Sequence, residues 1–401
     1  MRLNVLLSRE PFEKIFKNTL ESFLTENYHW QGEILWNRGN KIKSDCNYLL
    51  VNRNLNIIFS EKLSKRYLEL IAKGASFNRN LFNYVLRFIY CKLSISYFAR
   101  GFFSSDSVVI TNHRKSFDSW IILGGNTSIK IIDTLNKYCL VLNKKGFSDN
   151  FFKNSLFIRN YFPEITSPAL IDYDIDKGWC KEKLISGLPL ESYRSKNIKK
   201  NALQVAKEKM YSMYCKSRET VNLKSYLESI LKNINIEISN LNESYDNYLR
   251  NKLIKLTKNL SNNILLRNLN LLFLISYTHG DFHEGNIMLG HLKNSVNIID
   301  WEYAEKRSIF FDAIFIELRT SMPRGISKRI KNLLENKFQE KENILWCTQE
   351  DFSNKNLSCY IFVFLLEIIY LRLRESNMAK NIKSNKGLLI LIKELDLFLN
   401  V

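Results

Sequence analysis

The side chains best suited to chemistry lie in two short segments near residues 280 and 300. The first reads His279-Gly280-Asp281-Phe282-His283-Glu284-Gly285-Asn286, and the second reads Ile299-Asp300-Trp301-Glu302. Between them, the apolar runs 286–289 and 296–299 flank a polar turn, which predicts a β-hairpin. A hairpin brings the start of its first strand beside the end of its second, so Asn286 and Asp300 should lie at one end. Asp281 precedes Asn286 on a loop bracketed by glycines, so two carboxylates and one amide are expected to converge.

This set of groups is the one that phosphoryl transfer requires. The transferred group is held by positioning and electrostatics, and divalent metal ions neutralise its charge. Magnesium prefers oxygen ligands, which Asp300 and Asn286 can supply. Asp281 then remains to accept or align the proton of the attacking hydroxyl.

The double motif resembles the paired signature of the aminoglycoside phosphotransferase / choline kinase family, whose members have a protein-kinase-like fold. The continuation is similar to choline and ethanolamine kinases in particular, in Asp300-Trp301-Glu302-Tyr303-Ala304, Phe311-Asp312 and Glu317. The resemblance implies ATP and Mg²⁺ as cofactors, Asp281 as the catalytic base, and Asn286 and Asp300 as metal ligands. It also implies that Asp312 braces the catalytic loop. The specific match is limited to this segment, and a looser lobe pattern extends over 105–401.

Three other polar residues of the two segments need an interpretation. His279 is expected to orient the catalytic loop by hydrogen bonding rather than to transfer protons. His279 and His283 are four residues apart, but the HExxH pattern of a zinc site is absent and the neighbouring glycines argue against a helix. Glu302 could contact a cationic acceptor or brace the loop, and both interpretations stay open.

Residues that could bind the nucleotide are found upstream. Two strand-like runs are joined by Gly124-Gly125-Asn126-Thr127-Ser128. This loop could cover the phosphates or be a plain hairpin turn, since it departs from the GxGxxG pattern. A later segment, which begins at Glu182 and includes Leu184, resembles the hinge of the family, where backbone groups would hold the adenine.

The third strand of a kinase carries a lysine that pairs with the phosphates. Strand alternation places Leu140, Leu142 and Lys144 on one face, which favours Lys144 over Lys145. The helix predicted over 150–159 should offer this lysine a glutamate, but it contains none. The partner either comes from elsewhere or is missing, and a missing partner would put activity in doubt.

Strand and helix patterns divide the chain. Short β-branched runs predict antiparallel strands at 107–111, 120–123, 129–133, 138–142, 169–173 and 179–185. After Pro189, helical patterns follow at 198–214, 223–238, 245–260, 309–320, 326–338, 357–373 and 388–399. We therefore expect a two-lobed, protein-kinase-like α+β fold, with a β-rich N-lobe over 105–186 and a helical C-lobe over 187–401.

Residues 1–104 form a predicted N-terminal extension, which could dock the acceptor or a membrane. Helical patterns lie at 11–26 and 60–73. The segment 81–100 is apolar and aromatic, interrupted by Arg87, Lys92 and Arg100. It predicts either a buried helix or strand pair, or a basic and aromatic surface for a membrane or glycolipid.

The composition is that of a globular protein with an excess of positive charge. The chain has 401 residues, 45% of them hydrophobic, and a net charge of +19. A positive field favours anionic partners, although the even spread of charge also fits a coding bias. Seven scattered cysteines without a CxxC pair indicate free thiols in a reducing compartment. We expect a cytoplasmic protein without a signal peptide or spanning helix, in possible peripheral contact with an anionic membrane at its inner face.

The sequence thus predicts an ATP-dependent phosphotransferase with an alcohol group as acceptor, in which the nucleotide lies between the lobes. A strongly basic chain steers cationic acceptors poorly, which favours a hydroxyl of an anionic or lipid-linked sugar. Choline, ethanolamine or an aminoglycoside is the alternative acceptor. A non-catalytic nucleotide-binding protein is a further alternative. A specific nucleic-acid partner is not expected, because no recognition motif accompanies the positive charge.

Overall fold

The fold is known from a computed structural model of the whole chain. It describes residues 3–39, 47–65, 67–69, 81–112, 117–241, 245–265, 272–290, 295–335, 342–348, 354–378 and 386–399. The chain divides into two compact units. Unit 1 comprises Met1–Lys153, Pro168–Arg194 and Met288–Ser295, and unit 2 comprises Asn154–Ser167, Ser195–Ile287 and Val296–Val401.

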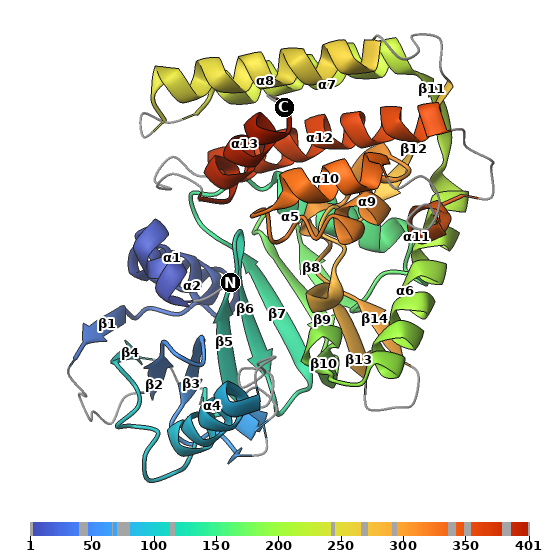
Figure 1. The fold of residues 1–401 in the computed structure, drawn as a ribbon. Helices are drawn as coiled ribbons and strands as arrows, with labels where there is room; N and C mark the ends of the chain where they lie inside the picture. The colour runs from blue at the N-terminus through green and yellow to red at the C-terminus, as the bar shows by residue number, and fades with distance from the viewer. Residues whose placement is uncertain are drawn as a thin grey trace. The chain divides into compact units, whose positions relative to one another are not determined.

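Unit 1 is built on a nine-stranded sheet in the order β1-β4-β2-β3-β5-β6-β7-β9-β8, with antiparallel neighbours. Its strands are β1 (Ile34–Arg38), β2 (Asn47–Asn52), β3 (Ile57–Ser60), β4 (Asp106–Ile110), β5 (Trp120–Gly124), β6 (Ser128–Asp133), β7 (Tyr138–Asn143), β8 (Leu170–Asp174) and β9 (Trp179–Lys183). In Figure 1, β5, β6 and β7 run side by side. The strands of residues 1–104 therefore belong to the same sheet as the later ones, and the boundary at residue 104 stays a prediction.

Helices cover both faces of this sheet. One face packs against α1 (Leu3–Arg9) and α2 (Phe12–Tyr28), which bury leucine and phenylalanine side chains against Ile129, Leu140 and Leu142. On the other face, Cys91 of α4 (Leu81–Ser94) packs with Phe59 and Ile121. Unit 1 also contains the short strand β10 (Gly187–Pro189), which pairs with β13 (Ile287–Gly290).

Unit 2 is mainly helical. Its helices are α6 (Lys196–Ser217), α7 (Leu223–Ser239), α8 (Asn247–Leu265), α9 (Phe311–Glu317), α10 (Ile326–Glu335), α11 (Glu342–Leu345), α12 (Asn354–Asn377) and α13 (Lys386–Leu399). Strand β12 (Leu272–Thr278) lies between β11 (Glu219–Asn222) and β15 (Glu305–Ser308). The end of β12 leads directly into the segment that holds Asp281, and β14 (Val296–Ile298) leads to Asp300.

Helix α12 is the central core helix of unit 2. Along the part of the chain that the structure describes, Asn356–Asn377 is the one stretch long and apolar enough to cross a bilayer, but 78% of its apolar window is buried inside the protein. In Figure 1 it lies among α7, α8 and α13. Its apolar character is thus explained by core packing.

The predicted pattern of elements is confirmed from residue 105 onward. Each of the six predicted strands is present as β4 to β9, and each of the seven predicted helices is present as α6, α7, α8, α9, α10, α12 or α13. The predicted α+β class is therefore correct. The helix predicted over 11–26 is α2, whereas much of the one predicted over 60–73 lies outside the described residues.

Candidate active site

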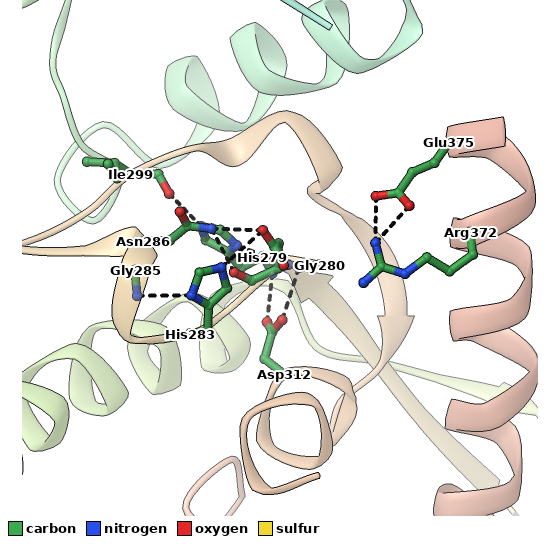
Figure 2. A network of polar contacts seen from close by, with 10 residues as sticks. His279, Gly280, His283, Gly285, Asn286, Ile299, Asp312, Arg372 and Glu375 are labelled. Carbon is green, nitrogen blue, oxygen red and sulfur yellow. Dashed lines mark hydrogen bonds and ion pairs between the residues drawn. The ribbon is translucent and has the colours of Figure 1, made fainter. Parts of the chain in front are cut away.

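The segment after β12 is held by a buried carboxylate. Asp312, in the first turn of α9, accepts hydrogen bonds from the backbone N–H groups of His279 at 2.7 Å and Gly280 at 3.0 Å (Figure 2). The hydroxyl of Tyr214 donates to the same carboxylate at 2.8 Å. Burial, together with Asp312, raises the pKa of Tyr214 well above its usual value, so the phenol stays a donor. The loop backbone is thereby fixed just before Asp281.

Only a glycine fits position 280. Its φ of +84° lies in the left-handed region, and an added Cβ would stand 2.3 Å from the carbonyl oxygen of Tyr303. A side chain there would therefore strain the backbone and push the two segments of the site apart.

Asp281 and Asn286 are in direct contact. The Asn286 amide nitrogen donates to Asp281 Oδ2 at 3.0 Å and to the Asp281 carbonyl oxygen at 2.9 Å. His283 Nε2 lies 3.4 Å from the same Oδ2, while its Nδ1 accepts the N–H of Gly285 at 2.9 Å (Figure 2). The Asp281 carboxylate is thus held by two side chains of its own loop, Asn286 and His283, and the contact with His283 was not expected from the sequence.

His279 is buried, and both ring nitrogens are engaged. Nδ1 accepts the backbone N–H of Asp281 at 3.2 Å, so the ring proton is on Nε2, which donates to the carbonyl oxygen of Ile299 at 2.9 Å. These bonds link the Asp281 loop to the end of the hairpin. This geometry is that of an orienting residue.

The predicted hairpin is present and brings Asn286 beside the Asp300 segment. At one end of the hairpin, the N–H of Ile299 donates to the carbonyl oxygen of Asn286 at 2.9 Å. At the other end, the N–H of Gly290 donates to the carbonyl oxygen of Ser295 at 2.9 Å. Asp300 follows Ile299 with a φ of +71°, which is uncommon for a residue that has a side chain. Such a conformation costs about 1–3 kcal/mol and persists at sites where the surroundings impose it.

The two predicted metal ligands have suitable chemistry. Because the Asn286 nitrogen is committed to Asp281, its amide oxygen is the atom that can serve a cation, and Asp300 adds a carboxylate. Across the described ranges, no group of three or more His, Cys, Asp or Glu side chains is placed to hold a metal ion.

A partly buried cation, Arg372, lies on α12. Arg372 donates from one guanidinium nitrogen to both oxygens of Glu375, at 2.8 and 2.7 Å (Figure 2). Burial acts to lower the pKa of Arg372, but Glu375, with further contributions from Asp281 and Tyr303, raises it. Arg372 is therefore a permanent positive charge whose field reaches Asp281.

In unit 1, Lys144 has the partner that the following helix lacks. Its ammonium lies 2.5 Å from a carboxylate oxygen of Glu10, and both side chains are fully buried. Glu10 lies between α1 and α2, whereas α5 (Asn150–Tyr161), which occupies the predicted helix position, has no glutamate. Sequence reasoning missed Glu10, because 134 residues separate it from Lys144.

The glycine-containing loop adjoins this ion pair. It joins β5 to β6 as a hairpin turn, in which the N–H of Gly125 donates a hydrogen bond to the carbonyl oxygen of Ser128 at 2.8 Å. Lys144 Nζ donates to the carbonyl oxygen of Asn126 at 3.2 Å. A Cβ on Gly124 would stand 2.5 Å from Leu6 Cδ1, so this glycine permits the close approach of α1. The structure thus brings Gly124, Gly125, Lys144 and the unpredicted Glu10 together within unit 1.

The remaining predicted residues have defined positions. Glu182 is buried in β9, where it contributes with burial to raising the pKa of Cys139 on β7. The backbone N–H of Leu184 donates to the carbonyl oxygen of Lys137 at 3.1 Å. Glu302 lies beside Asp300 in a single 3₁₀ turn, Trp301–Tyr303, and contributes with burial to raising the pKa of Tyr303.

Unit 2 also contains a cavity of about 330 Å³ beside β12 and β15, lined by Asn154, Phe157, Tyr277, Ala304, Glu305 and Lys306. Its acid is already neutralised, because Glu305 pairs with Arg307 at 3.0 Å and with Arg374 at 2.5 Å. Lys306 Nζ lies 5.2 Å from the centre of the Tyr277 ring. The cavity therefore offers no unbalanced negative charge to a cation.

No protein-family profile matches the sequence, and no curated protein sequence matches it. Among solved structures, the chain is similar to choline kinase LicA from Streptococcus pneumoniae, at 16% identity and a TM-score of 0.43, over 69% of this chain and 92% of that one. It is similar to an aminoglycoside phosphotransferase in complex with ADP and hygromycin B, at 11% identity and a TM-score of 0.46, over 71% and 94%.

A third similar structure is an ethanolamine kinase from Plasmodium vivax, at 15% identity and a TM-score of 0.45, over 70% of this chain and 80% of that one. Because these identities are low and the TM-scores lie below 0.5, the roles assigned below depend on residues of this chain alone. These three structures are a choline kinase, an aminoglycoside phosphotransferase and an ethanolamine kinase, and the double motif of this chain resembles the same family.

Proposed function

We propose that this protein is an ATP-dependent phosphotransferase that acts on an alcohol group. The observation that carries the proposal is the contact between Asp281 and Asn286 on a loop that Asp312 fixes. A carboxylate held in one orientation by an amide and a histidine is suited to receive a proton from a hydroxyl. The double motif of residues 279–286 and 299–302 agrees with this assignment.

In the proposed reaction, Asp281 accepts the proton of the acceptor hydroxyl. The acceptor oxygen forms a bond to the γ-phosphorus, the bond from that phosphorus to the β–γ bridging oxygen breaks, and ADP leaves. His283 and Asn286 hold the carboxylate in its reactive orientation. Asn286 and Asp300 would hold Mg²⁺, which, when bound, neutralises charge on the phosphate oxygens.

We further propose that Lys144 and Glu10 form the lysine–glutamate pair that the resemblance calls for, with Lys144 engaging the nucleotide phosphates. The pair adjoins the loop at Gly124 and Gly125, which would cover those phosphates. In this assignment Glu182 and Leu184 belong to the adenine-binding segment. The presence of Glu10 supports the catalytic assignment over that of a non-catalytic nucleotide-binding protein.

For the acceptor, we propose a hydroxyl on an anionic or lipid-linked saccharide. The net charge of +19 attracts anions. Choline, ethanolamine and aminoglycosides are cations, and the neutralised Glu305 of the cavity gives them no counter-charge. Glu302 is the remaining acid that could contact such a cation.

The test is an acceptor panel with ATP labelled at the γ-phosphate. Choline, ethanolamine, aminoglycosides, neutral hexoses and phosphorylated glycolipid cores are each incubated with the protein, ATP and Mg²⁺. Label transfer to a phosphorylated glycolipid core, abolished by EDTA, is the expected result. Transfer to choline alone would keep the reaction class and overturn the acceptor. Mg²⁺-dependent ATP binding without transfer to any acceptor would favour the non-catalytic alternative.

A further inference from the structure

The most unusual surface of the described chain lies on α4 and the turns that follow it. Large apolar side chains there are exposed rather than buried. On the helix they are Phe82, Val85, Leu86, Ile89 and Leu93, and beyond it Tyr97, Phe98 and Phe102. Phe98 is 97% exposed, Phe102 82% and Phe82 70%. We call these eight residues the α4 surface.

The spacing makes this surface continuous along the helix. The five helical members recur at intervals of three, one, three and four residues, which places them on one face of an α-helix. The opposite face, with Cys91 and Ile95, packs against the sheet beside Phe59. In Figure 1, α4 lies beside β3 and β5, the strands against which it packs. The helix therefore has one face in the core of unit 1 and one apolar face in solvent.

The sequence of α4 and the turns after it carries mainly positive charge, although Lys92 is paired with Glu69 at 2.9 Å. From residue 70 to residue 105 the sequence contains five basic residues, at 73, 79, 87, 92 and 100, and no acidic residue. Arg87 is exposed on α4, whereas Arg100 is buried and donates to the carbonyl oxygen of Leu63 at 3.1 Å. The whole of residues 1–100 carries a net charge of +8. An exposed aromatic and aliphatic face among basic residues matches the boundary between anionic headgroups and acyl chains.

We propose that the α4 surface binds an anionic lipid bilayer, with its apolar side chains in the headgroup–acyl boundary and Arg87 against lipid phosphates. A second copy of the chain is a poorer occupant, because a two-fold contact would bring two copies of the same basic patch together. This inference does not depend on the proposed phosphotransfer, and its readout is lipid binding rather than activity. If both hold, the enzyme would meet a lipid-linked acceptor at the membrane where that acceptor resides.

The experiment is flotation of the full-length protein with two kinds of vesicle. One contains phosphatidylglycerol mixed with phosphatidylcholine, and the other contains phosphatidylcholine alone. The test variant is Leu86→Ser with Ile89→Ser, and both residues are about half exposed, at 51% and 50%. The matched control is Leu135→Ser, which removes an apolar side chain that is 77% exposed in the turn after β6.

The wild type and the Leu135→Ser control should float with the anionic vesicles, and the double variant should bind them at least about tenfold more weakly. Binding should also weaken as salt is raised from about 0.1 M to 0.5 M. Equal flotation of the wild type and the double variant, or no flotation of the wild type, would overturn the proposal. A wild-type dimer in sedimentation that the double variant abolishes would assign the surface to a second copy and overturn it as well.

Discussion

The amide nitrogen of Asn286 donates to the Asp281 carboxylate at 3.0 Å, and the same residue accepts the N–H of Ile299, the neighbour of Asp300. Asn286 thus orients the proposed base and is itself a proposed metal ligand, joined by its backbone to the residue before Asp300, the second proposed ligand. In the proposed mechanism this couples the orientation of the base to the position of the cation. A change at Asn286 is therefore expected to affect both.

Replacing Asn286 with alanine should slow phosphoryl transfer by roughly 100-fold or more, because Asp281 loses its amide donor and the cation loses an oxygen ligand. The measurement is the transfer rate as a function of Mg²⁺ concentration at fixed ATP, where the Mg²⁺ midpoint should rise. Asn251→Ala, an exposed change on α8, is the control. An unchanged Mg²⁺ midpoint in the Asn286 variant would remove this residue from the metal site.

Asp312→Asn should destabilise unit 2 by about 2–4 kcal/mol. The buried carboxylate accepts hydrogen bonds from His279, Gly280 and Tyr214, and in the variant the amide NH₂ would face one of these donors, which loses its acceptor. Denaturant unfolding followed by fluorescence measures this difference. Asp176→Asn, in the exposed turn after β8, should change the free energy of unfolding by less than about 0.5 kcal/mol. Equal stabilities of the two variants would show that Asp312 does not brace the loop.

Because Lys144 and Glu10 form a buried ion pair, we expect the effects of replacing them on the free energy of unfolding to be non-additive in a double-mutant cycle. Glu10→Gln should cost about 3–5 kcal/mol of stability, since it leaves the buried ammonium of Lys144 without its counter-charge. Lys144→Met should cost less, because Glu10 keeps the guanidinium of Arg9 at 2.9 Å. The double variant should cost less than the sum of the two single variants, as measured by chemical denaturation. Additive costs would mean that the two side chains do not pair in solution.

The nucleotide role of Lys144 needs a separate measurement. Glu10→Gln keeps the shape of the side chain and should weaken Mg·ATP binding about tenfold by calorimetry at a temperature where the variant stays folded. The comparison is Lys130→Met on β6. Lys130 lies directly across from Val141 of β7. Its side chain is therefore on the opposite face of the sheet from those of Leu140, Leu142 and Lys144. Loss of ATP binding in the Lys130 variant, with normal binding in the Glu10 variant, would move the phosphate-binding role to Lys130.

Asp133 predicts a pH dependence of stability. Burial acts to raise its pKa, but hydrogen bonds from Asn136, Ser119 and Leu135 outweigh burial and lower it. A carboxyl whose pKa is lower in the folded state contributes stability above its unfolded value, near 3.9, and loses it as the pH falls through the folded value. Asp133→Asn should therefore cost about 1–2 kcal/mol at pH 7 and progressively less below about pH 4. A cost that stays constant from pH 7 to pH 3 would contradict this assignment.

Much of the fold follows from local sequence patterns. Strands β5 to β7 alternate with short polar turns, and the amphipathic helices after Pro189 have a clear 3.6-residue period, so both were predictable. The sequence also predicts the hairpin between Asn286 and Ile299, because a polar turn separates two apolar runs. These features depend on neighbours in the chain.

The rest depends on contacts between distant residues. The order of strands β1 to β4 cannot be derived from local pattern, since β4 pairs with both β1 and β2. Glu10 meets Lys144 only because α1 and α2 fold onto the face of the sheet where Leu140 and Leu142 lie. The sequence does not decide between a core and a surface position for the apolar face of α4, because an apolar helix has the same period in both settings.

The central claim is that Asp281 accepts the proton of an acceptor hydroxyl during transfer from Mg·ATP. The most direct test is transfer of γ-labelled phosphate by wild type and Asp281→Asn, together with the affinity of each for Mg·ATP. We predict that Asp281→Asn lowers the transfer rate by at least about 1,000-fold, whereas the affinity for Mg·ATP changes by less than about threefold. A variant that transfers phosphate at the wild-type rate would contradict the account.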